Sequence, residues 1–273
     1  MGAELFRLDG KQVVCVGGAT GMGAAAAQLA AELGAEITVL DVVEIEYPTK
    51  QSIQVDLADK ASVDAALALL GPCDALLSCA GVADGPDALM RINFISQRHI
   101  IDTMAADGRL GEGSAVGMIS SIGGLGWQQN VAQCLDFLTN DTWEAMQAWV
   151  DAHAGTNSYV FSKQAMNTYV AQQALGFATR GMRINSIMPG STDTPLARKN
   201  PDVWLPFQGD FREVTGDVHL TPEQMGNALV FLCMPAASGI NGTALVVDDG
   251  YVPSGITGTL ASPMVSMLLG TPA

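Results

Sequence analysis

The chain has 273 residues, of which 48% are hydrophobic and 15% charged, and its formal net charge is −15. One large α/β domain fits this length and two independent domains do not, so we expect a single domain over residues 1–273. The high hydrophobic content excludes a disordered chain. The negative charge disfavours nucleic acid and anionic membrane surfaces as partners, because binding to phosphates needs clustered Lys and Arg.

The sequence has neither a membrane-spanning run free of charge nor a charged-then-apolar N-terminal signal pattern, so we expect a cytoplasmic protein with no membrane partner. Its three histidines lie far apart and match no metal-ligand spacing, so no metal site is expected. The five cysteines include no CxxC pair, which favours buried free thiols. They are Cys15, Cys73, Cys79, Cys134 and Cys233.

Apolar, strand-like runs alternate with helix-length segments from residue 11 to about residue 250. This alternation predicts a doubly wound, seven-stranded parallel sheet with helices on both faces. The expected strands cover residues 12–17, 36–41, 52–55, 74–79, 114–120, 182–188 and 243–248. The expected helices cover residues 21–33, 60–70, 87–106, 157–178 and 222–233, with Gly34 as a stop signal and a capping box at 221–224.

Two segments fall outside this alternation. Residues 126–155 contain three tryptophans, and we expect a helix there, capped by Asp141 and Glu144. Residues 195–220 carry Trp204, Leu205, Phe207 and Phe211 between prolines, in a loop long enough to be a lid. Exposed aromatic rings are unfavourable unless they cover something apolar. For both segments, ordinary packing and a binding role remain open.

The first predicted strand runs directly into a turn that carries Gly17, Gly21 and Gly23. A glycine-rich turn between a strand and a helix points free backbone N–H groups and the positive end of the helix dipole at one spot, where a pyrophosphate can bind. A side chain at these positions would obstruct the turn or hold the phosphates and the helix away. The pattern predicts a dinucleotide cradle, with a bare turn as the alternative.

Asp41 ends the second predicted strand, 18 residues beyond Gly23. A carboxylate near this offset accepts hydrogen bonds from the adenosine ribose hydroxyls and repels a 2′-phosphate, which favours NAD over NADP. Val42 and Val43 follow it, so there is no arginine to hold an extra phosphate. A strand-terminal aspartate that makes a turn is the alternative.

Tyr159 and Lys163 stand four residues apart at the start of a predicted helix, so their side chains project from the same face. An ammonium ~4 Å away, at an effective dielectric constant of ~20, lowers the pKa of a tyrosine by roughly 3 units. Such a tyrosine can take a proton from an alcohol near neutral pH. A surface lysine beside a packed aromatic ring is the alternative.

These features are joined by Ser120-Ser121 at the end of a predicted strand, by Asn93 in the preceding helix, and by Pro189-Gly190 after another strand. Together they resemble the short-chain dehydrogenase/reductase family, from about residue 11 to residue 250. The resemblance implies a single Rossmann-like domain with oxidoreductase activity and a nicotinamide cofactor.

The resemblance also assigns roles to individual residues. Ser121 would hydrogen-bond the substrate oxygen, Tyr159 would transfer the proton, and Lys163 would contact the nicotinamide ribose and lower the pKa of the tyrosine. Asn93 matches an asparagine whose helix irregularity holds a proton-relay water. The cofactor-binding residues that it implies, together with Tyr159 and Lys163, are Gly17, Thr20, Gly21, Met22, Gly23, Asp41, Asp56, Leu57, Cys79, Ala80, Gly81, Pro189, Gly190, Thr192 and Thr194.

The sequence departs from the family pattern at two places. Cys79 stands where the family has an asparagine, and we expect cofactor binding to survive through the backbone of Ala80 and Gly81. Ser121 and Tyr159 are 38 residues apart, far more than the usual spacing, so residues 126–155 form an insertion before the catalytic helix. These features are similar to the bacterial 3α-hydroxysteroid dehydrogenase/carbonyl reductase branch.

We therefore expect an NAD-dependent oxidoreductase that interconverts a secondary alcohol and a ketone on an apolar cyclic, aromatic or steroid-like molecule. The residues expected to contact this substrate are Trp127, Trp204, Phe207 and Phe211. A protein that binds NAD(H) without catalysis, as a redox sensor or scaffold, is the alternative. The family resemblance also implies a homo-oligomer, a dimer or tetramer, although the insertion abuts the two helices that commonly form the contact.

Overall fold

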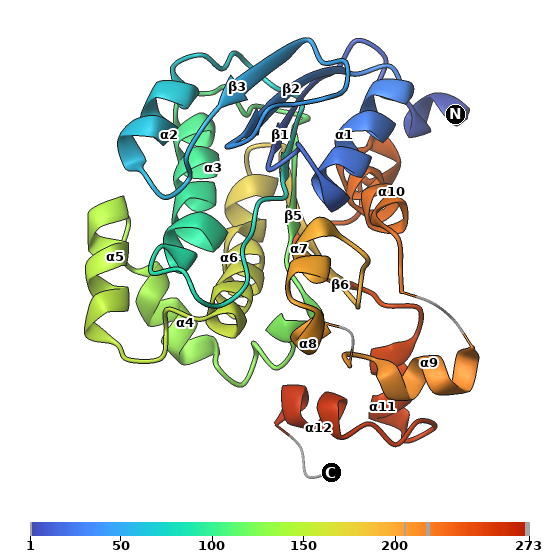
Figure 1. Cartoon of the computed structure of the whole chain (residues 1–273). Helices are drawn as coiled ribbons and strands as arrows, with labels where there is room; N and C mark the ends of the chain where they lie inside the picture. The colour runs from blue at the N-terminus through green and yellow to red at the C-terminus, as the bar shows by residue number, and fades with distance from the viewer. Residues whose placement is uncertain (1, 205, 217–218, 271–273) are drawn as a thin grey trace.

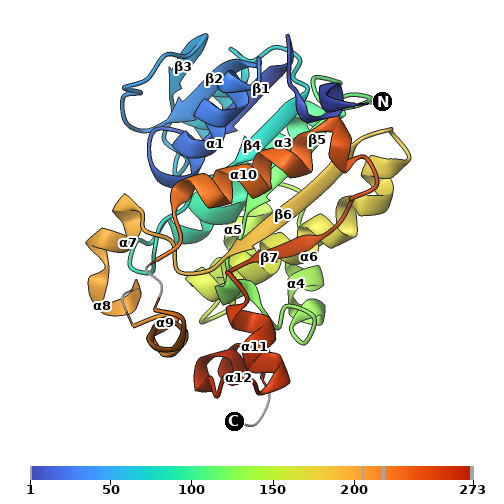
Figure 2. The same cartoon turned by 90° about the vertical axis from the view of Figure 1, so that its right-hand side faces the viewer.

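The computed structural model describes residues 2–204, 206–216 and 219–270. Its centre is a seven-stranded parallel sheet with the order β3-β2-β1-β4-β5-β6-β7 (Figures 1 and 2). The strands are β1 (Gln12–Val16), β2 (Glu36–Asp41), β3 (Gln51–Gln54), β4 (Ala75–Ser78), β5 (Ala115–Ile119), β6 (Arg183–Pro189) and β7 (Ala244–Val247). The predicted strands and the predicted fold class are confirmed.

The continuous apolar runs arise because both faces of the sheet are covered. Successive side chains of a strand point to opposite faces. Val14 and Val16 accordingly lie in one buried core, whereas Val13 and Cys15 lie in the other. A charged side chain on either face at these positions would be buried without a partner, which is costly.

Helices cover both faces of the sheet (Figure 2). On one face α1 (Gly21–Glu32) packs on α10 (Pro222–Cys233), and a Cβ on Gly226 would lie 2.9 Å from the backbone nitrogen of Ala26. Small residues therefore set the close approach of these two helices. The predicted capping box at the start of α10 is confirmed, with the Thr221 hydroxyl accepting from the amide of Gln224.

The other face is covered by α2 (Lys60–Leu67), α3 (Ser96–Ala106) and α6 (Tyr159–Ala178) (Figure 1). A π-helical turn over Arg91–Ile95 precedes α3, so the single helix predicted for 87–106 is interrupted. Asn93 lies inside this irregular turn. Among the described residues, no helix is long and apolar enough to cross a membrane.

The segment 126–155 forms two helices, α4 (Val131–Leu138) and α5 (Trp143–Ala152), which lie outside α3 and α6 (Figure 1). The predicted caps of its helix are wrong. Thr142 caps α5, because its hydroxyl oxygen accepts from the amide of Ala145 at 3.1 Å and so satisfies a free first-turn N–H.

The insertion has its own place in the core. Phe137 of α4 is fully buried, and its ring contacts those of Phe94, Trp149 and Phe161 at centroid distances of 5.5, 5.1 and 5.6 Å. The Trp143 ring is also buried, edge-on to His99. For these two tryptophans, Trp143 and Trp149, the structure supports packing against the main domain.

The predicted lid over 195–220 is helical where the sequence suggested a loop. Its helices are α7 (Pro195–Lys199), α8 (Pro201–Trp204) and α9 (Gly209–Thr215), and Leu205 lies outside the described residues. The C-terminal segment adds α11 (Tyr251–Thr257) and α12 (Pro263–Leu269), which lie beside α9 below the sheet (Figures 1 and 2). A third apolar cluster holds these parts together around the buried Tyr251.

Candidate active site

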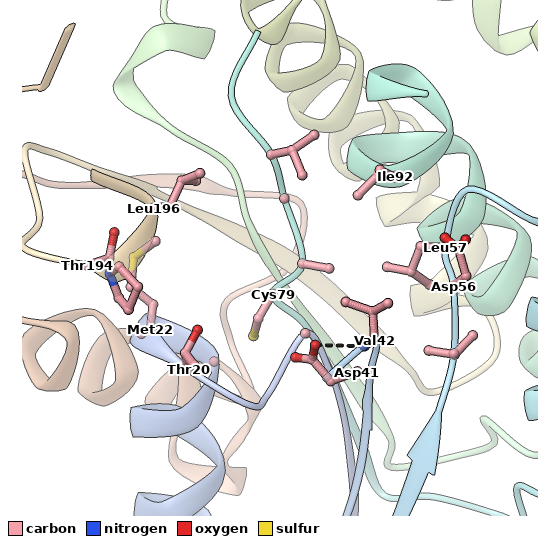
Figure 3. A pocket seen from close by; sticks show the side chains of 18 residues that line it. Thr20, Met22, Asp41, Val42, Asp56, Leu57, Cys79, Ile92, Thr194 and Leu196 are labelled. Carbon is pink, nitrogen blue, oxygen red and sulfur yellow. Dashed lines mark hydrogen bonds between the residues drawn. The ribbon is translucent and has the colours of Figure 1, made fainter. Parts of the chain in front are cut away.

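A cavity of about 350 Å³ opens at the carboxyl ends of β1, β2 and β4, where strand order reverses in a doubly wound sheet (Figure 3). Twelve of the predicted cofactor-binding residues line it: Gly17, Thr20, Gly21, Met22, Gly23, Asp41, Asp56, Leu57, Cys79, Ala80, Gly81 and Thr194. The structure therefore brings together segments that the chain separates by more than 170 residues. Sequence reasoning missed six further lining residues, which are Val42, Val55, Val82, Ile92, Pro195 and Leu196.

The glycine-rich turn is as tight as its sequence predicts. Gly17 has φ +79°, and a Cβ there would lie 2.4 Å from the backbone of Ala80. A Cβ on Gly23 would lie 2.0 Å from the carbonyl oxygen of Gly17. The Tyr47 hydroxyl donates to the carbonyl oxygen of Gly18 at 2.5 Å and fastens the turn from outside.

The start of α1 suits an anion. Thr20 stands at the N-cap position but its side chain makes no capping hydrogen bond, and the first turn holds no acidic residue. The first N–H groups of a helix need an acceptor and carry the positive end of its dipole. A cradle that side chains would fill, together with uncapped helix amides, fits the pyrophosphate of a dinucleotide.

Asp41 lines the cavity between Thr20 and Asp56 (Figure 3). Its Oδ2 accepts from the amide of Ala19 at 2.8 Å, and its Oδ1 accepts from the amides of Val42 and Val43 at 2.7 and 3.2 Å. These bonds fix the carboxylate between the glycine-rich turn and the end of β2. A carboxylate has about four lone-pair sites, so capacity remains for a ligand hydroxyl.

Besides Tyr159 and Lys163, three predicted cofactor residues lie away from the cavity lining. Pro189 ends β6, and a Cβ on Gly190 would meet Gln208 and Asp248 at 2.8 and 3.0 Å. The buried Thr192 donates its hydroxyl hydrogen to the carbonyl oxygen of Gly190 at 3.0 Å. These residues shape the backbone that leads to Thr194 at the cavity.

Ser121 and Tyr159 converge on Gly123. A Cβ on Gly123 would lie 3.3 Å from Ser121 Oγ and 3.4 Å from Tyr159 Cε1. Ser121 follows β5, and its Oγ accepts from the amide of Gly123 at 3.0 Å, which holds the hydroxyl at this position. Tyr159 is the first residue of α6, whose N-cap Ser158 accepts from the amide of Phe161. The two hydroxyl side chains can therefore reach one substrate oxygen.

Lys163 lies one helical turn behind Tyr159. Its buried Nζ donates to the carbonyl oxygen of Ile119 at 2.8 Å and lies 5.5 Å from the centre of the Tyr159 ring. A Cβ on Gly81 would lie 3.7 Å from this Nζ, so the ammonium also reaches the wall of the cavity. Lys163 thus stands between the tyrosine and the predicted cofactor site.

The electrostatics differ from the sequence expectation. Burial raises the pKa of Tyr159 to about 12, with a hydrogen bond from Ser121 acting in the opposite direction. Burial also lowers the pKa of Lys163 to about 8. The sequence predicts a pKa of Tyr159 lowered toward neutrality, and this prediction is wrong. Both groups lose hydration, and the Lys163 ammonium donates to the carbonyl oxygen of Ile119 rather than to the phenol.

Asn93 fastens the turn that follows β4. Its Oδ1 accepts from the amide of Val82 at 2.8 Å, and its Nδ2 donates to the carbonyl oxygen of Val82 at 3.0 Å. Its own carbonyl oxygen accepts from Gln97 Nε2 at 3.0 Å. In the structure, the side chain of Asn93 positions the cavity wall at Val82.

The four predicted substrate residues separate into different environments. The Trp204 ring faces Tyr159 edge-on, with 6.1 Å between ring centres. Phe207 and Phe211 instead contact Tyr251, at 6.5 and 5.9 Å. Trp127 lies partly exposed in the turn before α4. Only the Trp204 contact brings a predicted substrate residue to the predicted acid/base.

A dinucleotide cradle beside a Ser/Tyr/Lys set defines the class of nicotinamide-dependent oxidoreductases. Residues 145–252 match the family model described as enoyl-(acyl carrier protein) reductase. The chain is 30% identical to D-threitol dehydrogenase from Mycolicibacterium smegmatis, over 90% of this chain and 94% of that protein. It belongs to the short-chain dehydrogenase/reductase family, whose members act on alcohols and ketones with a nicotinamide cofactor.

The names of two other relatives refer to cyclic compounds. The chain is 29% identical to cis-4-hydroxycyclohexanecarboxylate dehydrogenase from Sinomonas cyclohexanicum, over 87% of this chain and 95% of that protein. It is 27% identical, with the same coverage, to 3-alpha-hydroxysteroid dehydrogenase/carbonyl reductase from Comamonas testosteroni.

The fold is also found in a crystal structure of the 3-alpha-hydroxysteroid dehydrogenase from Pseudomonas sp. B-0831 complexed with NADH. The two chains are 24% identical, with a TM-score of 0.70, over 91% of this chain and 98% of that chain. This likeness independently supports the Rossmann-like architecture.

Proposed function

We propose that the protein is an NAD-dependent oxidoreductase that interconverts a secondary alcohol and a ketone, with Tyr159 as the general acid/base. The observation that carries the proposal is the convergence of Ser121 and Tyr159 on Gly123, with Lys163 between them and the cavity. A substrate oxygen bound there would meet a hydrogen-bond donor and a proton-transfer group at once.

The cavity residues fit an NAD molecule. The backbone around Gly17 and Gly23 and the start of α1 would hold the pyrophosphate, and Asp41 would accept from the adenosine ribose hydroxyls. When bound, the nicotinamide accepts a hydride from the alcohol or donates one to the ketone. Val42 and the fixed Asp41 carboxylate favour NAD, because no cation at the end of β2 balances a 2′-phosphate among the residues described there.

The chain's own residues handle the proton. Ser121 would orient the substrate oxygen, and Tyr159 would take its proton during oxidation or return it during reduction. Because the pKa of Tyr159 is raised to about 12, the phenol starts protonated at neutral pH and is ready to act as an acid. Oxidation needs the phenolate, and a charged Lys163 stabilises it.

We infer an apolar, cyclic substrate from the aromatic ring that contacts Tyr159. Trp204 stands over Tyr159, and an indole edge offers apolar contact area rather than charge recognition. The two relatives named for cyclohexane and steroid compounds support the same class. Trp127, Phe207 and Phe211 remain predictions, and the partners of Phe207 and Phe211 favour a supporting role.

The test is a screen of cyclic alcohols, steroids and aryl alcohols, each with NAD and with NADP, read by absorbance of the reduced cofactor. We expect turnover with NAD and little with NADP. In Asp41→Ser the carboxylate is lost, and the preference for NAD should fall by about 10–100-fold through loss of roughly 1.4–2.7 kcal/mol of discrimination. NADH binding without turnover of any alcohol would favour the redox sensor or scaffold instead.

We also propose that the protein is cytoplasmic and forms a homo-oligomer. Because α4 and α5 lie over α3 and α6, the contact would have to use another surface. The edge strand β7, on which Leu245 is 39% exposed, offers one. Sedimentation should give a dimer or tetramer, and a monomer at micromolar concentration would refute the assembly.

A further inference from the structure

An acidic side chain from a distant loop holds the backbone of Tyr159. Asp84 follows the turn after β4, and its Oδ1 accepts from the Tyr159 amide at 2.7 Å. The two residues are 75 positions apart in the chain. Neither the glycine-rich turn nor the Tyr/Lys spacing pointed to Asp84.

This bond satisfies a donor that the helix itself leaves free. Tyr159 is the first residue of α6, and the first four amides of an α-helix lack an intrahelical acceptor. Ser158 accepts from the amide of Phe161 at 3.3 Å, whereas Asp84 accepts from the amide of Tyr159. A carboxylate also interacts favourably with the positive end of the helix dipole.

A second pair of hydrogen bonds fastens the same loop to the same helix start. Asn157 Nδ2 donates to the carbonyl oxygen of Asp87 at 3.3 Å, and Asn157 Oδ1 accepts from the amide of Met90 at 3.2 Å. The loop begins at Val82, which lines the cavity and whose amide donates to Asn93 Oδ1. The segment 82–90 therefore joins the cavity wall to the residue that carries the predicted acid/base.

We propose that Asp84 is a positioning residue, which fixes Tyr159 through its main-chain amide and sets the charge at the start of the catalytic helix. The proposal rests on the proposed role of Tyr159 for its kinetic consequence. Its structural consequence, order at the start of α6, does not depend on that role.

The charge of Asp84 acts on the phenol as well. After burial, the negative charge of Asp84 is the next influence that raises the pKa of Tyr159, and the hydrogen bond with Ser121 opposes it. The Lys163 ammonium of α6 lies near the same ring and carries the opposite charge, and the Trp204 ring of α8, which also contacts it, carries no charge. Removing the negative charge should therefore lower the pKa of Tyr159.

Two variants separate position from charge. Asp84→Asn keeps an acceptor oxygen and removes the charge, whereas Asp84→Ala removes both. Asp87→Asn is the matched control, because Asp87 lies in the same loop and contacts Asn157, two residues before α6, through its backbone carbonyl oxygen. All three changes are made in the full chain.

Hydrogen–deuterium exchange of the peptide that spans the start of α6 reads the positioning directly. We expect Asp84→Ala to speed exchange of its first-turn amides at least tenfold, and Asp84→Asn and Asp87→Asn to stay within threefold of the parent chain. Equal exchange in Asp84→Ala and the parent would overturn the positioning role whether or not the protein turns over an alcohol.

The pH profile of kcat/KM for alcohol oxidation with NAD reads the charge. We expect Asp84→Asn to keep most of the activity and to move the rising limb to lower pH by on the order of half a unit, because a negative charge that opposes the phenolate is lost. In Asp84→Ala, kcat should fall about tenfold with an unchanged KM for NAD.

An unmoved rising limb in Asp84→Asn, or equal losses of kcat in Asp84→Asn and Asp84→Ala, would contradict the proposal. Absent turnover in the parent chain would instead contradict the proposed function, and the exchange measurement would still decide the positioning role.

Discussion

The proposed cofactor side and the proposed substrate side of this site are built in different ways. On the cofactor side, short loops at the ends of β1, β2, β3 and β4 present backbone amides and two carboxylates, Asp41 and Asp56, around the cavity. On the substrate side, the lid helices, the insertion and α11–α12 pack their aromatic rings against the domain and against one another. Among the rings of these described segments, Trp204 is the one in contact with Tyr159.

The difference has a physical origin. A nucleotide phosphate is recognised by main-chain geometry, which leaves no room for a Cβ at Gly17 or Gly23. An apolar substrate is recognised by a shape that many side-chain combinations can provide. The first side therefore tolerates no side chain at Gly17 or Gly23, whereas the second can be rebuilt with the same fold.

The largest expected effect on cofactor affinity tests the backbone side. In Gly23→Ala the new Cβ would lie 2.0 Å from the carbonyl oxygen of Gly17, so the turn or α1 must move. We expect the affinity for NADH to fall at least 100-fold, by about 3 kcal/mol, as measured by fluorescence titration.

Gly71→Ala is the control for this change, because a Cβ at Gly71 meets nothing within 4 Å. Its affinity for NADH should equal that of the parent chain. Unchanged NADH affinity in Gly23→Ala would mean that the turn does not form the phosphate site.

The next effect tests the packed side. Phe137→Ala removes a fully buried ring that the insertion places among Phe94, Trp149 and Phe161. We expect the free energy of unfolding to fall by about 3–5 kcal/mol in denaturant titrations.

Leu135→Ala on the same helix is the comparison, since Leu135 is 38% exposed and should cost about 1 kcal/mol or less. A loss below about 1 kcal/mol in Phe137→Ala would show that the insertion is an appendage rather than part of the core.

The same contrast explains what could be predicted from the sequence. Gly17, Gly23 and Asp41 follow from local backbone geometry and strand ends, so the residues of the cradle could be identified from the sequence alone. The contacts of Trp204 with Tyr159 and of Asp84 with the Tyr159 amide join segments far apart in the chain, and no local pattern encodes them. The pKa of Tyr159 could not be predicted either, because it depends on burial.

Helix ends show a smaller version of this limit. Asp141 and Glu144 are the caps of this helix expected from the sequence, and the structure instead uses Thr142 to cap α5. By contrast, the Thr221/Gln224 capping box has reciprocal partners at fixed spacing and was predictable. The strands were predictable for a similar reason, because burial on both faces leaves an unbroken apolar run.

A smaller effect concerns the stability of the chain as a function of pH, which depends on the buried Lys163. The pKa of Lys163 is lowered by burial to about 8 from an ordinary 10.5, so between these values the unfolded chain binds more protons than the folded one. Stability should therefore rise with pH across this window, and the cost of burying the ammonium is largest below pH 8.

Lys163→Met removes this titration. We compare the free energy of unfolding of the parent chain with that of the variant. As the pH rises from about 7.5 to about 10, the parent chain should become more stable relative to Lys163→Met by about 1–3 kcal/mol. The other titrating groups are common to both proteins and largely cancel. Parallel stability curves would contradict a lowered pKa for Lys163.

The most direct test of the proposed chemistry is turnover by Tyr159→Phe, a change that removes the phenolic hydroxyl and keeps the ring that contacts Trp204. We predict that kcat for oxidation of a cyclic secondary alcohol with NAD falls by roughly 10²–10⁴-fold, while the affinity for NADH stays within about threefold. Turnover near that of the parent chain would contradict the assignment of Tyr159 as the acid/base.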